Sequence, residues 1–328
     1  MISTEQKYLY TAFGLRILSD IPLPGSAVIA WQDPSVDVRV EMGDLLALWS
    51  QLSTEDDIFV VRDNFVMFQI TNVAIYLVKD GNTIIVSPIG EQSAEKLRLY
   101  LDGYGMSTLL LQRKSLPLHG SAIVIDGRAY AIVGQSGAGK STLTKAFLDR
   151  GYSFLSDDII PVSFSEDGKQ VMVEPAIPEQ KLWQECLDEF GMDRSNYHTI
   201  YERVARVDDQ VETKTKFAIP VTRFFDRPLP LAGIFELVKS EAVDEVAVDS
   251  IEKADKFRAI MQHTFNRALI PPMGLMAWSF TLTTNLTKQI PIYTLTRPTT
   301  RFTASELVSL MIDTIEKEYG YGQNHHTG

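Results

Sequence analysis

The chain has 328 residues, of which 45% are hydrophobic and 22% are charged. This is the composition of a folded globular protein, and the length suits about two domains. Its 31 basic and 42 acidic residues give a formal net charge of -11. We therefore expect no nucleic-acid partner, because phosphate contacts require clustered Lys and Arg.

The sequence also bears on the cellular compartment. Cys186 is the single cysteine, which excludes an intramolecular disulfide and a cysteine-rich zinc site. No apolar run approaches the roughly 18 residues that a membrane span requires. The first residues lack the basic and then apolar layout of a secretory signal. We expect a cytoplasmic protein with no membrane partner.

Residues 1–90 are expected to form a β-rich N-terminal domain. Residues 36–41 alternate between apolar and charged types, as a half-buried strand does. Further strands are predicted at 58–61, 65–70, 74–78 and 83–86, and together they favour an antiparallel sheet. A connecting helix follows over 91–116, where Gly103 and Gly105 are expected to loosen the middle.

The second domain is predicted to span 117–320, followed by a disordered tail over 321–328. It begins with strands at 121–125 and 129–133, a glycine-rich loop, a helix at 141–149 and a strand at 153–155. This order indicates an α/β fold, with the N-terminal part α+β. Further expected elements are a mobile loop at 195–216, strands at 232–238 and 292–295, a helix at 250–268 and a last helix capped by Thr303 and Glu306.

The glycine-rich loop has the Walker A pattern, in which a strand leads into a phosphate-binding loop and a helix. Its residues are Gly134, Gln135, Ser136, Gly137, Ala138, Gly139, Lys140 and Ser141. Glycines allow successive N–H groups to point at phosphate oxygens. The helix adds its positive N-terminal end. Lys140 would reach the β- and γ-phosphates, and Ser141 would offer its hydroxyl to Mg²⁺.

Two further features lie close to this loop in the sequence. Asp157 and Asp158 follow the strand after the loop helix, where carboxylates can hold Mg²⁺ or take a proton from an attacking hydroxyl. A turn or helix cap is the alternative role for an Asp pair. His119 precedes the hairpin that runs into the loop, so it could orient the Asp pair or stabilise charge.

Four basic residues in the segment 195–216 are candidates to stabilise charge on a transferring phosphoryl group. They are Arg203, Arg206, Lys214 and Lys216, of which Arg206 and Lys214 are favoured. The same segment contains acidic residues, so a solvated charged loop is the alternative interpretation.

These motifs together resemble the catalytic core of HPr kinase/phosphorylase, whose fold is shared with phosphoenolpyruvate carboxykinase. The resemblance rests on the order Leu118-His119-Gly120-Ser121, then residues 134–142, then Arg150-Gly151-Tyr152 and then Ser156-Asp157-Asp158. It is closer to the HPr-kinase-like proteins of lasso-peptide gene clusters, which phosphorylate a precursor peptide, typically on a C-terminal serine. Thr142 stands where HPr kinases usually have Glu, which favours a one-way kinase on another acceptor.

The resemblance implies a role for each matching residue. Residues 134–142 would bind ATP, with Mg²⁺ (or Mn²⁺) held by Ser141 and Asp158. Asp157 would be the general base, and His119 and Lys140 would complete the catalytic set. The implied function is an ATP-dependent serine kinase whose partner is a lasso precursor peptide.

Two other functions remain open from the sequence. One is a kinase or phosphorylase that acts on HPr or on a small hydroxyl compound in metabolic regulation. The other is a nucleotide-gated binding module without transfer activity, against which the Asp pair and His119 argue, because a sensor needs no base. The sequence does not indicate an oligomeric state.

Overall fold

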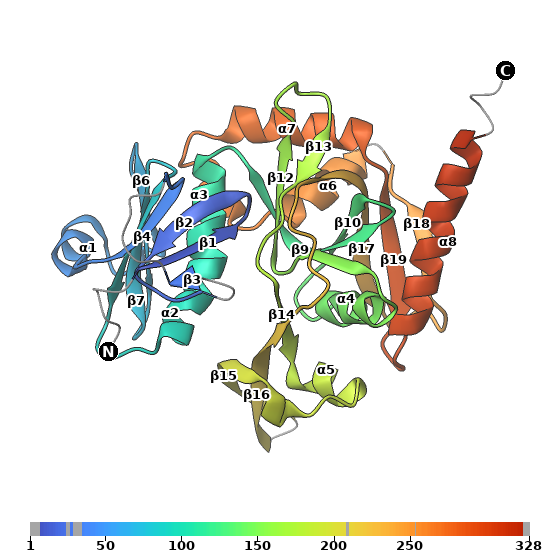
Figure 1. Cartoon of the computed structure of the whole chain (residues 1–328), viewed down its shortest axis with the longest axis horizontal. Helices are drawn as coiled ribbons and strands as arrows, with labels where there is room; N and C mark the ends of the chain where they lie inside the picture. The colour runs from blue at the N-terminus through green and yellow to red at the C-terminus, as the bar shows by residue number, and fades with distance from the viewer. Residues whose placement is uncertain (1–6, 24–26, 29–34, 208–209, 253, 324–328) are drawn as a thin grey trace.

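The computed structural model describes residues 7–23, 27–28, 35–207, 210–252 and 254–323. In 27–28, 203–207, 210–212 and 319–323 it describes the backbone alone. The chain forms a mixed α/β structure with two large sheets and one small sheet (Figure 1).

The first large sheet has the strand order β3-β1-β2-β4-β8-β7-β6-β5. Its strands are β1 (Tyr8–Ala12), β2 (Leu15–Ser19), β3 (Ala27–Val28), β4 (Val38–Met42), β5 (Phe59–Val61), β6 (Phe65–Ile70), β7 (Ala74–Lys79) and β8 (Thr83–Pro88), with helix α1 (Leu46–Leu52) between β4 and β5. The strands predicted from 58 onward are confirmed with small shifts at their ends. The expectation of a wholly antiparallel sheet is wrong, because β4 pairs in parallel with both β2 and β8. Parallel pairing depends on a long connection, which local hairpin signals do not report.

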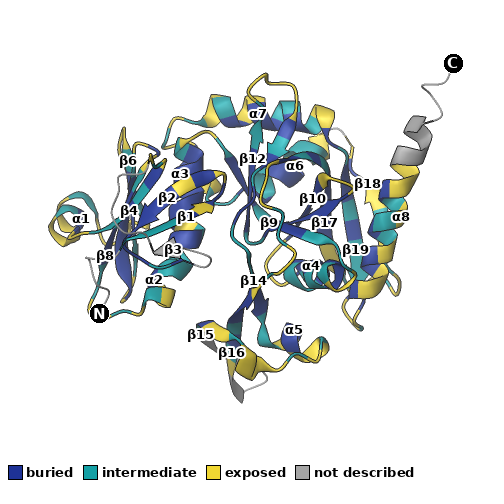
Figure 2. Cartoon of the chain, in the orientation of Figure 1, coloured by how far each residue is buried: buried dark blue, intermediate teal, exposed yellow. Residues whose placement is uncertain are grey.

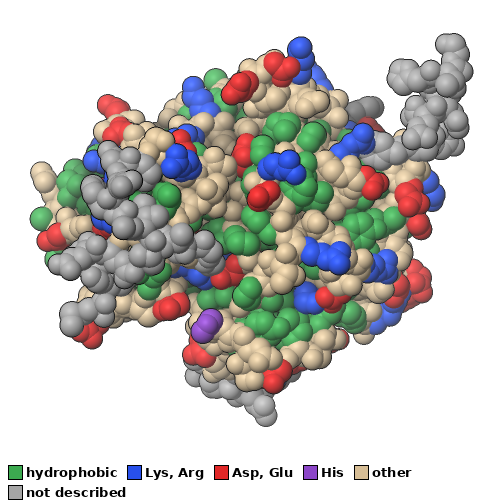
Figure 3. Space-filling model, viewed as in Figure 1, with side chains coloured by type: hydrophobic (Ala, Val, Ile, Leu, Met, Phe, Trp, Pro, Cys, Tyr) green, Lys and Arg blue, Asp and Glu red, His purple; other side chains and the backbone are tan. Residues whose placement is uncertain are grey.

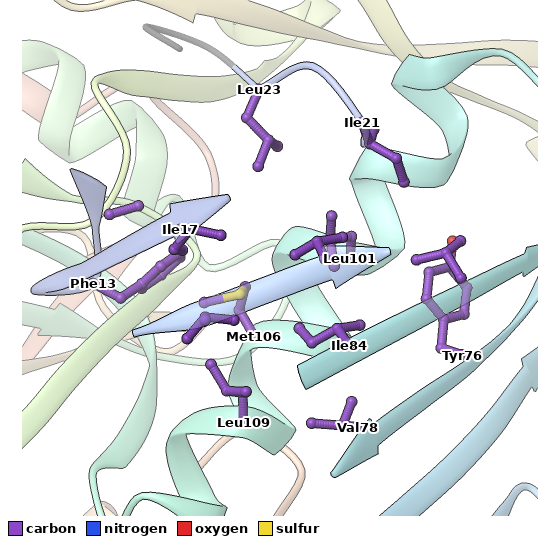
Figure 4. Close-up of a cluster of buried hydrophobic side chains, with 14 of the residues drawn as sticks. Phe13, Ile17, Ile21, Leu23, Tyr76, Val78, Ile84, Leu101, Met106 and Leu109 are labelled. Atoms are coloured by element: carbon purple, nitrogen blue, oxygen red, sulfur yellow. The ribbon is translucent and has the colours of Figure 1, made fainter. Parts of the chain in front are cut away.

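One face of this sheet is covered by a helix that is interrupted in its middle. The segment consists of α2 (Ala94–Tyr100), a π-helical turn (Leu101–Gly105) and α3 (Met106–Gln112). The turn contains both predicted glycines and confirms that the helix is loosened there. Leu101, Met106 and Leu109 point into the buried cluster against the sheet (Figure 4). Helix α3 also contacts β9, so this segment joins the first sheet to the second.

The second large sheet carries the glycine-rich loop. Its main order is β10-β9-β12-β13-β17-β19-β18, and β10 also pairs in parallel with β17. The strands are β9 (Leu116–Ile125), β10 (Arg128–Val133), β11 (Ser153–Ser156), β12 (Ile159–Phe164), β13 (Val171–Val173), β17 (Leu229–Ser240), β18 (Ala247–Ser250) and β19 (Ile292–Pro298). The predicted strands at 121–125, 129–133, 153–155, 232–238 and 292–295 are therefore confirmed.

Helices cover both faces of this sheet (Figures 1 and 2). They are α4 (Lys140–Asp149), α6 (Ala254–Gln262), α7 (Met276–Gln289) and α8 (Ala304–Gln323). Helices α4 and α8 bury their apolar side chains in one cluster with the sheet, and α6 and α7 bury theirs in another. The strands between them are mostly buried, as Figure 2 shows. The three-layer packing holds the loop between β10 and α4 at a rigid edge.

Strand β9 changes partners along its length. Residues 116–119 pair with β12, whereas residues 120–125 pair with β10. Gly120 stands at the change, and a Cβ atom there would lie 2.3 Å from the carbonyl oxygen of Ile132. The close approach of the two backbones therefore requires glycine at this position.

The third sheet corrects the prediction for 195–216. This segment was expected to be a mobile loop, but it forms most of two long strands. The sheet consists of β14 (Glu179–Trp183), β16 (Gln210–Pro220) and β15 (His198–Val207), with α5 (Gln184–Glu189) and the 3₁₀ turn Arg194–Asn196 beside it. Its charged residues alternate with apolar ones, such as Phe217 and Ile219, that pack against α5. The many charged residues of this segment made the period-2 pattern of a strand hard to recognise in the sequence.

Two smaller expectations also change. The helix predicted at 250–268 ends at Gln262, and the 3₁₀ turn Arg267–Leu269 follows it. Helix α8 begins after Thr303 as expected, but its capping box is absent. Glu306 pairs with Arg301, and the Thr303 hydroxyl is buried with no hydrogen-bond partner among the described residues. The helix continues through Gln323, and 324–328 lie outside the described residues.

The surface agrees with the mixed charge of the chain. Basic and acidic side chains alternate over the face seen in Figure 3. Across the described ranges, no helix has both the length and the apolar character needed to cross a membrane.

We predict that Gly120→Ala lowers the free energy of unfolding by about 1–3 kcal/mol, because the added methyl group forces two strands apart. Gly103→Ala is the control, since a Cβ atom there would meet only the Phe265 ring, at 4.0 Å. Denaturant unfolding measures both variants. Equal stability of the two would contradict the close approach at β9.

Candidate active site

The loop between β10 and α4 requires glycine at both of its ends. Gly134 has a φ of 153°, and a Cβ atom there would lie 2.6 Å from the carbonyl oxygen of Leu237 on β17. Gly139 has a φ of 107° and immediately precedes α4. The loop therefore exposes backbone N–H groups at the N-terminus of a ten-residue helix. This is the arrangement that binds phosphate.

Lys140 is the first residue of α4, and its side chain reaches back to the start of the loop. Its ammonium donates hydrogen bonds to the carbonyl oxygens of Gly134, at 2.8 Å, and Gln135, at 3.1 Å. Burial lowers the pKa of Lys140, and the nearby carboxylates of Asp158 and Asp157 oppose this effect. The charge of Lys140 is thus held at the start of the loop, on the side of Gln135.

The Asp157–Asp158 pair lies in the turn between β11 and β12, and three groups fix it. The Ser121 hydroxyl donates to Oδ1 of Asp157 at 2.6 Å, and the backbone N–H of Lys181 donates to Oδ2 at 2.9 Å. The backbone N–H of Gly120 donates to the carbonyl oxygen of Asp158. Asp158 has a left-handed backbone with a φ of 63°. The turn is therefore held by β9 on one side and by β14 on the other.

Asp158 is ionised and bound to two lysines of the third sheet. Its Oδ2 lies 3.1 Å from Nζ of Lys181, and its Oδ1 lies 3.6 Å from Nζ of Lys216. Burial alone would raise the pKa of Asp158, but Lys216, Lys181 and His119 together outweigh burial and hold the pKa well below its usual value. Burial would lower the pKa of Lys181, but the carboxylates of Asp158 and Asp102 outweigh burial and raise it.

The pKa of Asp157 is shifted in the opposite direction. Burial, and then the neighbouring charge of Asp158, raise the pKa of Asp157 above its ordinary value. The hydrogen bonds from Ser121 and Lys181 oppose this rise. Two adjacent carboxylates with opposite pKa shifts are suited to different tasks, one accepting a proton and the other staying charged.

His119 lies where β9 changes partners, and its Nδ1 is 3.1 Å from the carbonyl oxygen of Asp158. Burial, and then the charge of Lys140, lower the pKa of His119, so the imidazole is neutral at pH 7. The ring packs edge-to-face on Phe265, with centroids 5.3 Å apart. His119 therefore lies beside the Asp pair, and its role in orienting the pair or stabilising charge stays a prediction.

These residues share one cleft of about 500 Å³, here called the reaction cleft. Of the residues singled out in the sequence, it is lined by His119, Ser136, Gly137, Gly139, Lys140, Ser141, Thr142, Asp157, Asp158, Lys214 and Lys216. Gly134 and Gln135 line the neighbouring cavity, and Ala138 is buried beneath the loop. The sequence prediction thus identified residues that the fold brings together from four separate segments.

The structure describes the side chains of two of the four basic candidates, Lys214 and Lys216. Lys216 reaches Asp158, whereas Lys214 is bound to Glu185 at 2.8 Å. The side chains of Arg203 and Arg206 lie outside the described residues. Arg206, one of the two favoured cations, therefore stays a prediction.

Two basic residues of the site were missed. Lys181 comes from β14 and reaches Asp158. Arg297, at the end of β19, donates from Nε to the carbonyl oxygen of Ala138 at 2.9 Å and lines the reaction cleft. Only tertiary structure brings either residue to the site. The one available signal was Lys181-Leu182-Trp183, which follows Pro178 in the sequence.

Comparisons with known proteins give a partial match. No family model matches the chain. A segment of 111 residues is 35% identical to an HPr kinase/phosphorylase from Azoarcus sp.. The match covers 34% of this chain and about a third, 32%, of that relative. The Hpr(Ser) kinase/phosphatase structure from Coxiella burnetii aligns with 64% of this chain and 96% of its own, at 16% identity and a TM-score of 0.34.

We predict that Ser121→Ala raises the pKa of Asp157 by about one further pH unit, because the lost hydrogen bond favours the charged carboxylate. An NMR titration of the Asp side-chain carboxyl resonances measures this shift. Ser107→Ala is the matched control, since that buried hydroxyl donates to a backbone carbonyl instead. An unchanged Asp157 titration in Ser121→Ala would contradict the arrangement.

Proposed function

We propose that the chain is an ATP-dependent kinase that transfers the γ-phosphoryl group to a serine hydroxyl. One observation carries this proposal: the glycine loop, Lys140 and the Asp157–Asp158 pair open into the same cleft. A phosphate loop alone would fit any nucleotide-binding protein. A carboxylate pair with opposed pKa shifts beside that loop fits transfer to a hydroxyl.

The phosphates of ATP would lie along the loop. The ammonium of Lys140 is held near Gln135, so the Gln135 end of the loop suits the γ-phosphate. The end of the loop beside α4 suits the α-phosphate. Arg297 lies against the loop near Gly139 and would add positive charge there. Binding ATP thus depends on backbone N–H groups, one lysine and one arginine.

The residues present fit a Mg²⁺ ion that is bound together with ATP. Among the described residues, no group of three or more His, Cys, Asp or Glu side chains could hold a metal ion. Mg²⁺ needs fewer protein ligands when phosphates supply the others. Ser141 and Asp158 line the same cleft and offer a hydroxyl and an ionised carboxylate. The metal would neutralise charge that develops on the phosphates.

A smaller pocket of about 160 Å³ on the α4 side suits the nucleoside. It is lined by Thr142, Arg297, Phe302 and Thr303, among others. The exposed ring of Phe302 offers a stacking surface for the base. The partnerless hydroxyl of Thr303, noted above, would gain a hydrogen bond there.

Asp157 is the proposed base. The serine oxygen forms a bond to the γ-phosphorus, the bond from that phosphorus to the bridging oxygen breaks, and ADP leaves. The serine proton passes to Asp157. Each oxygen of Asp157 already accepts one hydrogen bond and keeps a second lone pair for the proton. Neutral His119 and the Ser121 hydroxyl hold the turn in place during this step.

For the acceptor we propose a ribosomal peptide precursor of the lasso class, phosphorylated at its C-terminal serine. This choice rests on the sequence resemblance described above and on Thr142. HPr is the second candidate acceptor, and the 35% identity over 111 residues to an HPr kinase/phosphorylase favours it. An assay read by intact mass, with ATP, Mg²⁺ and each acceptor in parallel, separates the two.

We predict that Asp157→Asn lowers the transfer rate by at least about a hundredfold while ATP binding stays near its original affinity, because the base is lost and the loop is intact. Lys140→Ala should weaken ATP binding as well. Phosphate transfer and equilibrium ATP binding are measured on both variants. Transfer retained in Asp157→Asn would contradict the base assignment.

We predict that Lys216→Gln moves the acid limb of the pH–rate profile to higher pH. Burial and Asp158 raise the pKa of Asp157, the proposed base, and Lys216 opposes this rise. Removal of Lys216 therefore raises that pKa further, and transfer is lost earlier as the pH falls. Lys214→Gln is the matched control, because that ammonium pairs with Glu185 instead. Identical acid limbs in the two variants would contradict this role of Lys216.

A further inference from the structure

A second and larger cavity adjoins the reaction cleft and has no role in ATP binding as proposed above. It measures about 950 Å³ and lies between the π-helical turn, residues 257–267 and the start of the phosphate loop. We call it the entry cleft. His119 and Ser136 line both cavities, so the entry cleft opens to the reaction cleft beside the carboxylate pair.

The entry cleft has an aromatic wall that leads to His119. The Tyr104 ring meets Phe265 edge-to-face at 5.7 Å, and Phe265 meets His119 at 5.3 Å. Asn266, with a φ of 52°, fixes the wall by donating to the Ser107 hydroxyl at 2.8 Å. Tyr104 itself is 38% exposed. The wall is therefore a built apolar surface that remains accessible.

The rim of the entry cleft is cationic. Arg258 and Arg267 line it, and no Asp or Glu is among its described lining residues. Arg258 is held by Asp255 and Gln262. Within the ranges that the structure describes, the exposed guanidinium of Arg267 has no hydrogen-bond or ion-pair partner. An arginine beside an apolar wall suits a ligand that joins an apolar group to a carboxylate.

The position of the cleft indicates which substrate it takes. In-line transfer places the nucleoside and the acceptor on opposite sides of the phosphoryl group. The pocket with Thr142 and Phe302 lies on the α4 side, whereas the entry cleft is lined by Gly134, Gln135 and Ser136 at the opposite end of the loop. The entry cleft is therefore on the acceptor side.

We propose that the entry cleft binds the acceptor peptide, and that Arg267 recognises a carboxylate beside the reacting serine while Tyr104 and Phe265 contact an apolar residue. This inference rests on the proposed kinase function. The carboxylate is either the α-carboxylate of a C-terminal serine or a neighbouring Asp or Glu side chain. Both sources offer the same bidentate group to arginine.

The test uses short synthetic peptides that carry one serine after an aromatic residue. The two peptides of the first pair end in serine, one as the free acid and the other as the amide. The two peptides of the second pair have an internal serine, which is flanked by Glu in one and by Gln in the other. For the full chain we expect kcat/KM to favour the carboxylate form of at least one pair by about tenfold or more, mainly through KM. Arg267→Gln should remove this preference, while the control Arg227→Gln, on an exposed arginine outside both clefts, should keep it.

A binding measurement on the Asp157→Asn variant separates the two proposals. Calorimetry measures how tightly the same peptides bind to this variant while a non-hydrolysable ATP analogue is present. Carboxylate-dependent binding that requires Arg267 supports the entry cleft even where no peptide is phosphorylated, and that result would overturn the kinase function alone. Equal binding of acid and amide forms, or a preference unchanged in Arg267→Gln, overturns the inference. A change in nucleotide affinity in place of peptide affinity assigns the cleft to the nucleoside and also overturns it.

Discussion

Three consecutive residues of β9 bind the turn that carries the two carboxylates. His119 Nδ1 and the backbone N–H of Gly120 both contact the carbonyl oxygen of Asp158, and the Ser121 hydroxyl binds Asp157. The same stretch of β9 is where the pairing with β12 ends and the pairing with β10 begins, and β10 leads into the glycine-rich loop. This change of partners therefore sets the position of the Asp pair relative to the loop. The geometry of the site follows from main-chain pairing, which is stiffer than side-chain contact.

The third sheet supplies the positive charge beside the Asp pair. Lys181 and Lys216 come from neighbouring strands and bind the same carboxylate, so Asp158 stays ionised although it is partly buried. Asp157, one residue away, receives a hydroxyl and a backbone N–H in place of ammonium groups. The difference between these two sets of partners explains why adjacent side chains of identical chemistry have opposed pKa shifts.

Much of the site could be predicted from the sequence, because its core is local. The loop 134–141 is contiguous, and the Asp pair follows at the end of the next strand, so spacing alone placed them together. Lys181 and Arg297 could not be found in this way, since they reach the site only through β14 and β19. The fold shows the same division. Hairpins such as β6-β7-β8 were predicted, whereas the parallel pairs of β4 depend on contacts distant in the sequence. The hairpin of β15 and β16 is local, but the many charged residues of this segment hid its alternation.

Two residues of the entry cleft lie away from β9, and their position has an evolutionary consequence. Tyr104 belongs to the helix that covers the first sheet, and Arg267 follows α6, so neither residue belongs to β9 or to the glycine-rich loop. Under the proposed function, substitutions at these two positions would alter which acceptor is recognised without disturbing the transfer chemistry. A duplicated copy of this chain would then acquire a new substrate by changing a few surface side chains, while the residues of β9 would remain under selection for both folding and the proposed catalysis.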